Sequence, residues 1–128
     1  MDTIANLITN LKNAGNAGHE TVSLPHSALK TAICNVLKKE GFVKDCAVEM
    51  EKGKKTLVVS LFSENRNPKI KGVQRISKPS KRIYKKAEEI RAVKSGYGSL
   101  ILSTSAGIMS GKEAKKAKLG GEALFNIW

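Results

Sequence analysis

The chain has 128 residues and a mass of 13.8 kDa, which suits one domain or two small lobes and excludes a large multidomain enzyme. Its 23 Lys and Arg against 11 Asp and Glu give a net charge of +12, which indicates a polyanionic partner, either nucleic acid or an anionic membrane surface. Hydrophobic residues make up 41%, too many for a disordered tail, and aromatic residues at 5% argue against an aromatic stacking sheet.

The first half of the sequence carries alternating helix and strand signals. Apolar residues from Ile4 to Leu11 recur at helical spacing, and the turn-rich residues 13–18 end this predicted helix. A short strand is expected over residues 20–24 and a second helix from Ser27 to Gly41. Residues 42–50 and 56–63 read as strands joined by a hairpin at Lys52-Gly53. Residues 1–64 therefore predict an α-β-α-β-β lobe.

The second half is expected to be mostly strand, following a polar linker that contains Pro68. Strands are predicted over residues 73–76, 82–85, 100–102 and 122–128, with one or two helical turns at 88–93. Ser110 and Glu113 have the spacing of a capping box, which predicts a short helix to about Lys118. The fold class is α+β, with two small lobes at residues 1–64 and 65–128.

The positive charge is concentrated in the second lobe. Residues 1–64 hold 8 basic and 7 acidic residues, whereas residues 65–128 hold 15 basic and 4 acidic ones. Nine basic residues occur between positions 66 and 86 with no acid among them: Arg66, Lys69, Lys71, Arg75, Lys78, Lys81, Arg82, Lys85 and Lys86. Such a run can be a solvated face, but its imbalance favours phosphate binding, which releases condensed counterions.

A second candidate site is the hydroxyl-rich segment Ser103-Thr104-Ser105-Ala106-Gly107, which follows the apolar strand. Its hydroxyls could bond to phosphates, riboses or base edges, and Gly107 would permit close backbone approach. Spacing alone favours the other interpretation, a turn whose hydroxyls satisfy local backbone groups. Tyr84 is similarly open, because its ring could stack on an unpaired base or belong to the core.

No convincing catalytic or metal site is present in the sequence. Residues 107–113 resemble a phosphate-binding loop faintly, but one residue is missing between the glycines and Glu113 replaces the magnesium-binding hydroxyl. The two histidines and two cysteines lack a recognised zinc spacing, and a catalytic Cys-His pair has only isolated residues to support it. We expect no enzyme activity, no cofactor and no metal.

The expected compartment is the cytoplasm. No segment approaches the roughly 20 apolar residues that a membrane helix needs. The first residues lack the basic region of a signal peptide, and two cysteines make no disulfide framework. A membrane role is therefore not expected.

Several motifs together resemble one known family. The most specific begins at the hydroxyl segment and reads Ser103-Thr104-Ser105-Ala106-Gly107-Ile108-Met109, then Ala114, then Gly120-Gly121-Glu122. Two others are Arg75-Ile76-Ser77-Lys78-Pro79 with Arg82-Ile83-Tyr84, and Asp2, Ile4 and Ala5 with Ile8-Thr9 and Asn13-Ala14. In order, they resemble the bacterial small-subunit ribosomal protein number eight family almost from end to end, with departures at Ser80, Ser110 and Gly111.

The resemblance implies a non-enzymatic, two-lobed protein of the cytoplasmic ribosome that binds the central domain of small-subunit (16S-type) ribosomal RNA early in platform assembly. It raises the hydroxyl segment from a turn to the leading contact candidate. The implied RNA-binding residues in the second lobe are Ser103, Thr104, Ser105, Gly107, Tyr84, Glu122, Gly121, Arg75, Lys78, Lys81 and Arg82. Those in the first lobe are Thr3, Lys12, Asn13 and Lys30.

The same resemblance implies ribosomal proteins five and twelve as neighbours, and a possible second role as translational repressor through the messenger RNA of its own operon. The alternative is a basic nucleic-acid or protein-interaction module without a specific ribosomal RNA site. A helix-turn-helix version of that alternative is disfavoured, because the basic run contains Pro79 and has strand and loop character.

Overall fold

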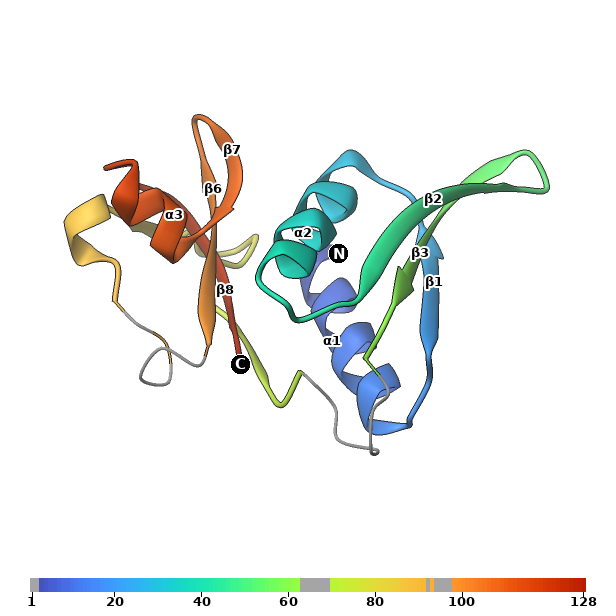
Figure 1. The fold of residues 1–128 in the computed structure, drawn as a ribbon. Coiled ribbons are helices and arrows are strands. Elements are labelled where there is room, and N and C mark those ends of the chain that lie inside the picture. The colour runs from blue at the N-terminus through green and yellow to red at the C-terminus, as the bar shows by residue number, and fades with distance from the viewer. Residues whose placement is uncertain (1–2, 63–69, 92, 94–97) are drawn as a thin grey trace. The chain divides into compact units, whose positions relative to one another are not determined.

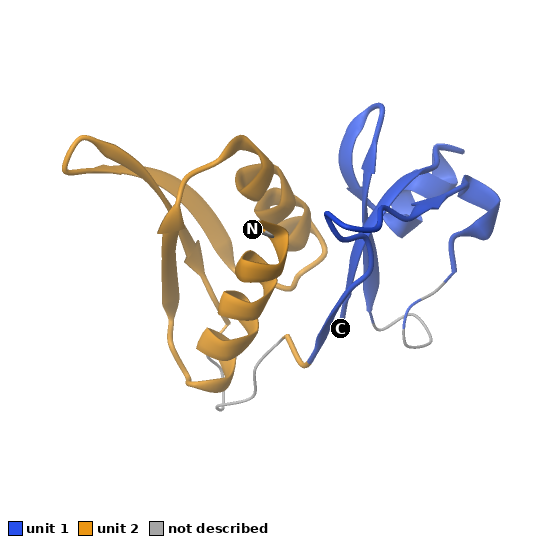
Figure 2. Ribbon diagram, turned by 180° about the vertical axis from the view of Figure 1, so that it is seen from behind, with its two compact units in different colours: residues 1–2, 72–128 blue, residues 3–71 orange. Residues whose placement is uncertain are grey.

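The computed structural model describes residues 3–62, 70–91, 93 and 98–128 (Figure 1). The chain divides into two compact units, here called the N-terminal unit (Thr3–Lys71) and the C-terminal unit (Gly72–Trp128), coloured orange and blue in Figure 2. The proposed linker at residues 64–69 lies outside the described residues. Within the described part of the chain, no helix is both long and apolar enough to cross a membrane.

The N-terminal unit has the predicted α-β-α-β-β order. Its elements are α1 (Thr3–Asn16), β1 (Thr21–Pro25), α2 (Ala28–Lys39), β2 (Asp45–Glu51) and β3 (Lys54–Ser60). The three strands form an antiparallel sheet in the order β1-β3-β2, and both helices lie on the same face of it (Figure 1). The core of this unit lies between that face and the two helices.

Local sequence signals explain most of these boundaries. Ser27 caps α2 by accepting a hydrogen bond from the Lys30 backbone nitrogen at 3.1 Å, and Gly41 takes the left-handed conformation expected after the helix, with φ of 84°. β2 starts at Asp45 and not at Phe42 as predicted. The Phe42 backbone N–H donates to the Leu37 carbonyl at the end of α2, and its side chain is buried. Residues 42–44 therefore finish the helix connection before the strand begins.

The C-terminal unit is a five-stranded antiparallel sheet with one short α-helix. The elements are β4 (Val73–Arg75), β5 (Tyr84–Lys85), a 3-10 helix (Ala87–Glu89), β6 (Ser99–Thr104), β7 (Gly107–Ser110), α3 (Gly111–Lys116) and β8 (Gly121–Ile127). β8 lies in the middle, because it pairs with β4 and β5 on one side and with β6 on the other. The α+β class with two lobes is confirmed.

One strand of this unit is absent from the sequence-based prediction. That prediction makes the hydroxyl-rich segment a loop leading to the capped helix, but Ser103 and Thr104 belong to β6 and Gly107 begins β7. The segment is thus a tight β6–β7 hairpin whose ends pair from Ile101 to Ser110. β7 has only four residues, too few to show an alternating pattern. The predicted cap of α3 is present, since the Ser110 hydroxyl accepts from the Glu113 backbone nitrogen at 3.3 Å.

Gly121 holds the position where two strands approach most closely. It pairs with Thr104 across β8 and β6, and a Cβ built at Gly121 would lie 2.2 Å from the Ser103 carbonyl oxygen. The neighbouring atoms belong to the backbone, so a side chain could be accommodated only if the strands moved apart. Gly121 therefore serves packing directly beside the β6–β7 hairpin.

We predict that Gly121→Ala destabilises the protein by about 1–3 kcal/mol, the usual cost of overpacking. Gly111→Ala is the matched control, because its Cβ would meet a side-chain atom, Ile90 Cγ2, at 3.0 Å. Urea unfolding of both variants tests this. Equal stability of Gly121→Ala and the unmodified chain would contradict the steric argument.

Candidate RNA-binding surface

The β6–β7 hairpin uses one of its hydroxyls to build the turn. The Thr104 hydroxyl donates to the Gly107 carbonyl oxygen at 2.8 Å and accepts from the Ala106 backbone nitrogen at 3.1 Å. Gly107 has a φ of 112°, a conformation that favours glycine, and nothing lies within 4 Å of where its Cβ would be. Thr104 and Gly107 thus shape the turn, and Gly107 is explained by its backbone conformation.

Ser105 is different, because its exposed side chain forms no hydrogen bond with the described residues. It lies at the tip of the hairpin, between the Thr104 hydroxyl and Gly107. Ser103 is half-buried on β6, and its hydroxyl also lacks a bonded partner among the residues that the structure describes. The three hydroxyls, which look alike in the sequence, therefore differ in the structure: that of Thr104 is bonded within the turn, and those of Ser103 and Ser105 are not.

The central strand gathers residues that are distant in the sequence. Glu122 on β8 pairs with Tyr84 on β5 and with Ser103 on β6. Residues directly opposite one another in a sheet share a face, so these three side chains form a row across three strands. The Tyr84 side chain is 69% exposed, so it does not belong to the core, which was one of the two interpretations of this residue. Its ring is accessible on the same face of the sheet as Ser103, with Glu122 between them.

The carboxylate of Glu122 is held within the protein. Its Oε2 accepts a hydrogen bond from the Ser77 hydroxyl and another from Arg82 Nη1 at 3.0 Å. Ser77 is fully buried, and its oxygen also accepts from the Ile83 backbone nitrogen at 3.2 Å. The sequence analysis does not select Ser77 as a site residue, although Ser77 belongs to the quoted motif from Arg75 to Pro79, which is the available signal.

Electrostatics at Glu122 follow from these bonds. Burial alone would raise the pKa of this carboxyl, but the hydrogen bonds from Ser77 and Arg82 and the positive charges of Arg82 and Arg75 outweigh it. The pKa of Glu122 therefore lies below its ordinary value of 4.5. The group is ionised at neutral pH and compensates part of the dense positive charge around it.

The basic residues fall into two groups. Lys78 and Lys81 are exposed and close a tight turn through reciprocal backbone hydrogen bonds of 2.9 and 3.0 Å. Arg75 instead donates to the Leu124 carbonyl, and Arg82 is paired with Glu122. The two lysines are thus presented outward on an anchored turn, while the two arginines also brace the sheet.

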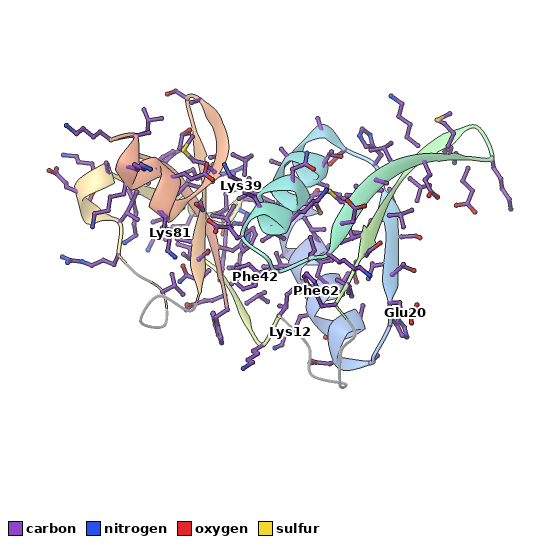
Figure 3. The ribbon with its side chains drawn as sticks, viewed as in Figure 1. Lys12, Glu20, Lys39, Phe42, Phe62 and Lys81 are labelled. Carbon is purple, nitrogen blue, oxygen red and sulfur yellow. The ribbon has the colours of Figure 1, made fainter. Side chains whose placement is uncertain are left out.

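The candidates in the N-terminal unit lie on its two helices. Thr3, Lys12 and Asn13 belong to α1, where Thr3 and Asn13 are exposed and Lys12 is half-buried. Lys30 on α2 donates its amine to the Pro25 carbonyl at 3.0 Å. Figure 3 labels Lys12 and Lys81, one from each unit. Within the described part of this unit, the structure does not gather these candidates into a hydrogen-bonded cluster.

The cysteine chemistry considered from the sequence finds no support. Cys34 is fully buried, and burial, together with the nearby Cys46, raises the pKa of its thiol to about 12 despite the opposing charge of Lys30. Such a thiol is protonated at neutral pH and is a poor nucleophile. Among the described residues, no group of three His, Cys, Asp or Glu side chains is arranged to hold a metal ion.

Comparison with known proteins gives a consistent result. The family model described as ribosomal protein S8 matches residues 2–128. The chain is 46% identical to "Small ribosomal subunit protein uS8" of Mycoplasmopsis synoviae, over 99% of this chain and 97% of the relative. The proteins of the same name from Roseiflexus castenholzii and Kocuria rhizophila are 44% and 45% identical over the same shares.

These matches place the chain among the ribosomal proteins, a structural and non-enzymatic class. More specifically, it belongs to the ribosomal protein S8 family. The family expected from the sequence motifs is therefore confirmed.

We predict that Glu122→Gln lowers the free energy of unfolding by about 1 kcal/mol at pH 7, because the ion pair with Arg82 becomes a hydrogen bond to an uncharged amide. A carboxylate whose pKa is lowered by folding stabilises the folded state fully at pH values above its unfolded-state pKa. This stabilisation is lost as the pH falls through its folded-state pKa. The difference in free energy of unfolding between the unmodified chain and Glu122→Gln should therefore stay constant down to about pH 5 and become smaller below that pH.

Urea unfolding between about pH 3 and 7 measures this difference across the range in which carboxyl groups titrate. Glu88→Gln is the control, because Glu88 is an exposed carboxylate of the same unit on the 3-10 helix. A pH-independent difference for Glu122→Gln would show that the ionised carboxylate is not what stabilises the sheet.

Proposed function

We propose that this protein is a structural constituent of the small ribosomal subunit in the cytoplasm and a primary binder of the central domain of small-subunit ribosomal RNA, helping to assemble the platform. The observation that carries the RNA-binding part is the row across β5, β8 and β6. In that row Ser103 and exposed Tyr84 flank Glu122, whose carboxylate binds Ser77 and Arg82 on either side of the basic turn. Family membership supports the ribosomal part.

The RNA that fits this surface is a helix interrupted by an irregular internal loop. A regular RNA helix hides its base edges in a deep, narrow major groove, whereas an irregular loop presents them to short side chains. Ser105 and Ser103 would bond to such edges, and Tyr84 would stack on an unpaired base. Lys78 and Lys81 would neutralise phosphates without reading sequence.

The remaining candidates of the C-terminal unit would act in support of these interactions with RNA. Thr104 and Gly107 set the turn, Gly121 lets β8 approach β6, and Glu122 holds Ser77 and Arg82. Arg75, bonded to the Leu124 carbonyl, would act from the sheet beside them. Their positive or polar groups can still reach RNA at the edges of this row.

The N-terminal unit would add backbone contacts through Thr3, Lys12, Asn13 and Lys30. Ribosomal proteins five and twelve are proposed as neighbours in the particle, and the messenger RNA of its own operon as a second ligand that mimics the ribosomal site. The alternative, a basic module without a specific RNA site, predicts binding that depends on charge alone.

The first test of this function is Ser105→Ala. Loss of a hydroxyl that bonds a base edge should weaken cognate RNA binding by about 1–3 kcal/mol, the cost of leaving a buried partner unpaired. Binding to scrambled RNA and the melting temperature should hardly change. Gel-shift titration and thermal melting measure these quantities, and footprinting on ribosomal RNA should give one protected internal-loop helix.

Thr104→Ala is the matched comparison, because it removes the hydroxyl that closes the turn. It should lower the melting temperature as well as cognate binding. The proposed reading role of Ser105 would be wrong if Ser105→Ala lost stability and still discriminated between the two RNAs. Diffuse protection along the RNA would support the non-specific module.

The second test concerns the basic turn. Replacing Lys78 and Lys81 by Ala should weaken cognate and scrambled RNA alike and flatten the salt dependence of both. The slope should fall by roughly 0.7 to 0.9 in log affinity per tenfold salt for each phosphate that the protein no longer neutralises. Lys52→Ala with Lys55→Ala, at the hairpin of the N-terminal unit, removes the same charge elsewhere. An unchanged slope in the Lys78 and Lys81 variant would remove this turn from the interface.

A further inference from the structure

An apolar pocket of about 210 Å³ opens on the C-terminal unit beside the start of β6. Three apolar side chains line it: Leu100 on β6, Ile90 after the 3-10 helix, and Val93. Leu100 and Ile90 are buried members of one hydrophobic cluster, and Val93 packs against that cluster. Among the described lining residues, Ser99 has the only uncharged polar side chain. The pocket is therefore a place where the core of this unit is open to a ligand.

The pocket lies on the opposite face of the sheet from the row proposed to bind RNA. Successive side chains of a strand point to opposite faces. Leu100 and Leu102 share the face that α3 covers, because both belong to the cluster that contains Ala114 of α3. Ser103 follows Leu102 on β6 and points to the other face, with its partner Glu122. The RNA-binding row therefore does not account for this pocket.

Positive charge surrounds the opening. Three exposed cations line the pocket: Arg91, Lys112 and Lys115. The Lys115 amine donates to the Ile90 carbonyl oxygen at 3.5 Å, which holds one ammonium group beside the apolar floor. No acidic side chain is among the described lining residues. The two segments that carry these cations, residues 85–91 and 111–118, hold seven basic and three acidic residues, so the charge stays positive when neighbouring acids are counted.

The size and the lining of the pocket favour one apolar side chain as its occupant. An apolar cavity of about 150 Å³ holds a benzene ring, so this volume suits a leucine or phenylalanine side chain. Sites for small molecules are larger, at roughly 300 to 1,000 Å³. A nucleobase would fit by volume, but the apolar walls would leave the polar atoms of its edges without partners, which is unfavourable.

The charge of the opening selects the surroundings of that side chain. Carboxylates beside the apolar anchor would meet the three cations, whereas basic residues there would be repelled. A second copy of this chain is disfavoured as the occupant, because two molecules of net charge +12 repel each other. The remaining partner is a different protein with an acidic segment.

We propose that this pocket binds an acidic segment of another protein, which inserts one leucine or phenylalanine side chain between Ile90, Val93 and Leu100. Flanking carboxylates pair with Arg91 and Lys112. The buried anchor supplies most of the affinity, and the exposed ion pairs supply selectivity. The inference goes beyond the proposed function, because it assigns the α3 side of the sheet to a protein and leaves the Ser103 face to RNA.

The test uses the full chain and a capped peptide of five residues, in which phenylalanine stands between two pairs of glutamates. Binding should shift the methyl resonances of Ile90, Val93 and Leu100 in NMR titrations. Replacing the phenylalanine by alanine should weaken binding at least tenfold, because the buried ring is lost. A peptide with lysine in place of every glutamate should not bind, because its charge matches that of the opening.

A charge swap at the opening provides the decisive variant. Arg91→Glu with Lys112→Glu should weaken the glutamate peptide by about tenfold or more and create binding of the lysine peptide. Lys116→Glu with Lys118→Glu is the matched control, because it changes the net charge equally at two exposed lysines that do not line the pocket. Gain of lysine-peptide binding also shows that the swapped protein is folded.

Four results would overturn the proposal: no binding of the glutamate peptide, equal binding of the alanine peptide, equal binding of the lysine peptide, or glutamate-peptide binding that the swap leaves unchanged. Self-association that the swap alters would assign the pocket to a second copy and would overturn it as well.

RNA affinity separates this inference from the proposed function. The two double variants should lower RNA affinity by the same factor, because they change the net charge equally. A larger loss in Arg91→Glu with Lys112→Glu would assign these cations to RNA and would overturn the proposal. Failure of the RNA proposal at Ser105→Ala would leave the peptide result standing, and the reverse holds too.

Discussion

The carboxylate of Glu122 is the interaction on which the C-terminal unit depends most. It lies on the central strand, binds the buried Ser77 hydroxyl and pairs with Arg82, so one acid joins β8 to both ends of the basic turn. Residues 72–128 hold 12 basic and only 4 acidic residues, and mutual repulsion of this positive charge opposes compaction of the unit. One well-placed negative charge lets the sheet close while Lys78 and Lys81 remain exposed.

A division of labour follows among residues that look equivalent in the sequence. The Thr104 hydroxyl donates one hydrogen bond and accepts another within the turn. The Ser105 hydroxyl, one position later, forms none with the described residues and is exposed. Arg82 is paired, whereas Lys81 next to it is exposed. In each motif, one residue thus has a structural role while its neighbour leaves a polar or charged group exposed to solvent.

Strong local signals in the sequence predict their elements correctly. The helical spacing of α1, the Ser27 and Ser110 caps and the Gly41 stop all confirm what elementary rules indicate. β7 escapes prediction because four residues show no periodicity, and β2 is predicted to start too early because buried Phe42 resembles a strand residue while it closes a helix. Local pattern cannot tell these cases apart, since the deciding contacts are tertiary.

The candidate site shows the same limit more clearly. Family motifs select Tyr84, Ser103 and Glu122, but only strand pairing reveals that they form one row. The roles within the set depend on hydrogen bonds between residues as far apart as Ser77 and Glu122, which no spacing rule contains. The composition indicates a polyanionic partner and the half of the chain that would bind it. The fold is needed to tell the residues that brace the sheet from those that are proposed to contact RNA.

The position of β8 in the chain has a consequence for synthesis. β8 is the middle strand of its sheet, yet it follows all of its partner strands in sequence order. While the ribosome is still adding residues 121–127, β4, β5 and β6 have no strand to join them, whereas every element of the N-terminal unit has already been made. The first unit can fold during translation, but the hydroxyl hairpin and the tyrosine come together only after the last strand has emerged. The proposed RNA-binding surface is thus incomplete until β8 has been made.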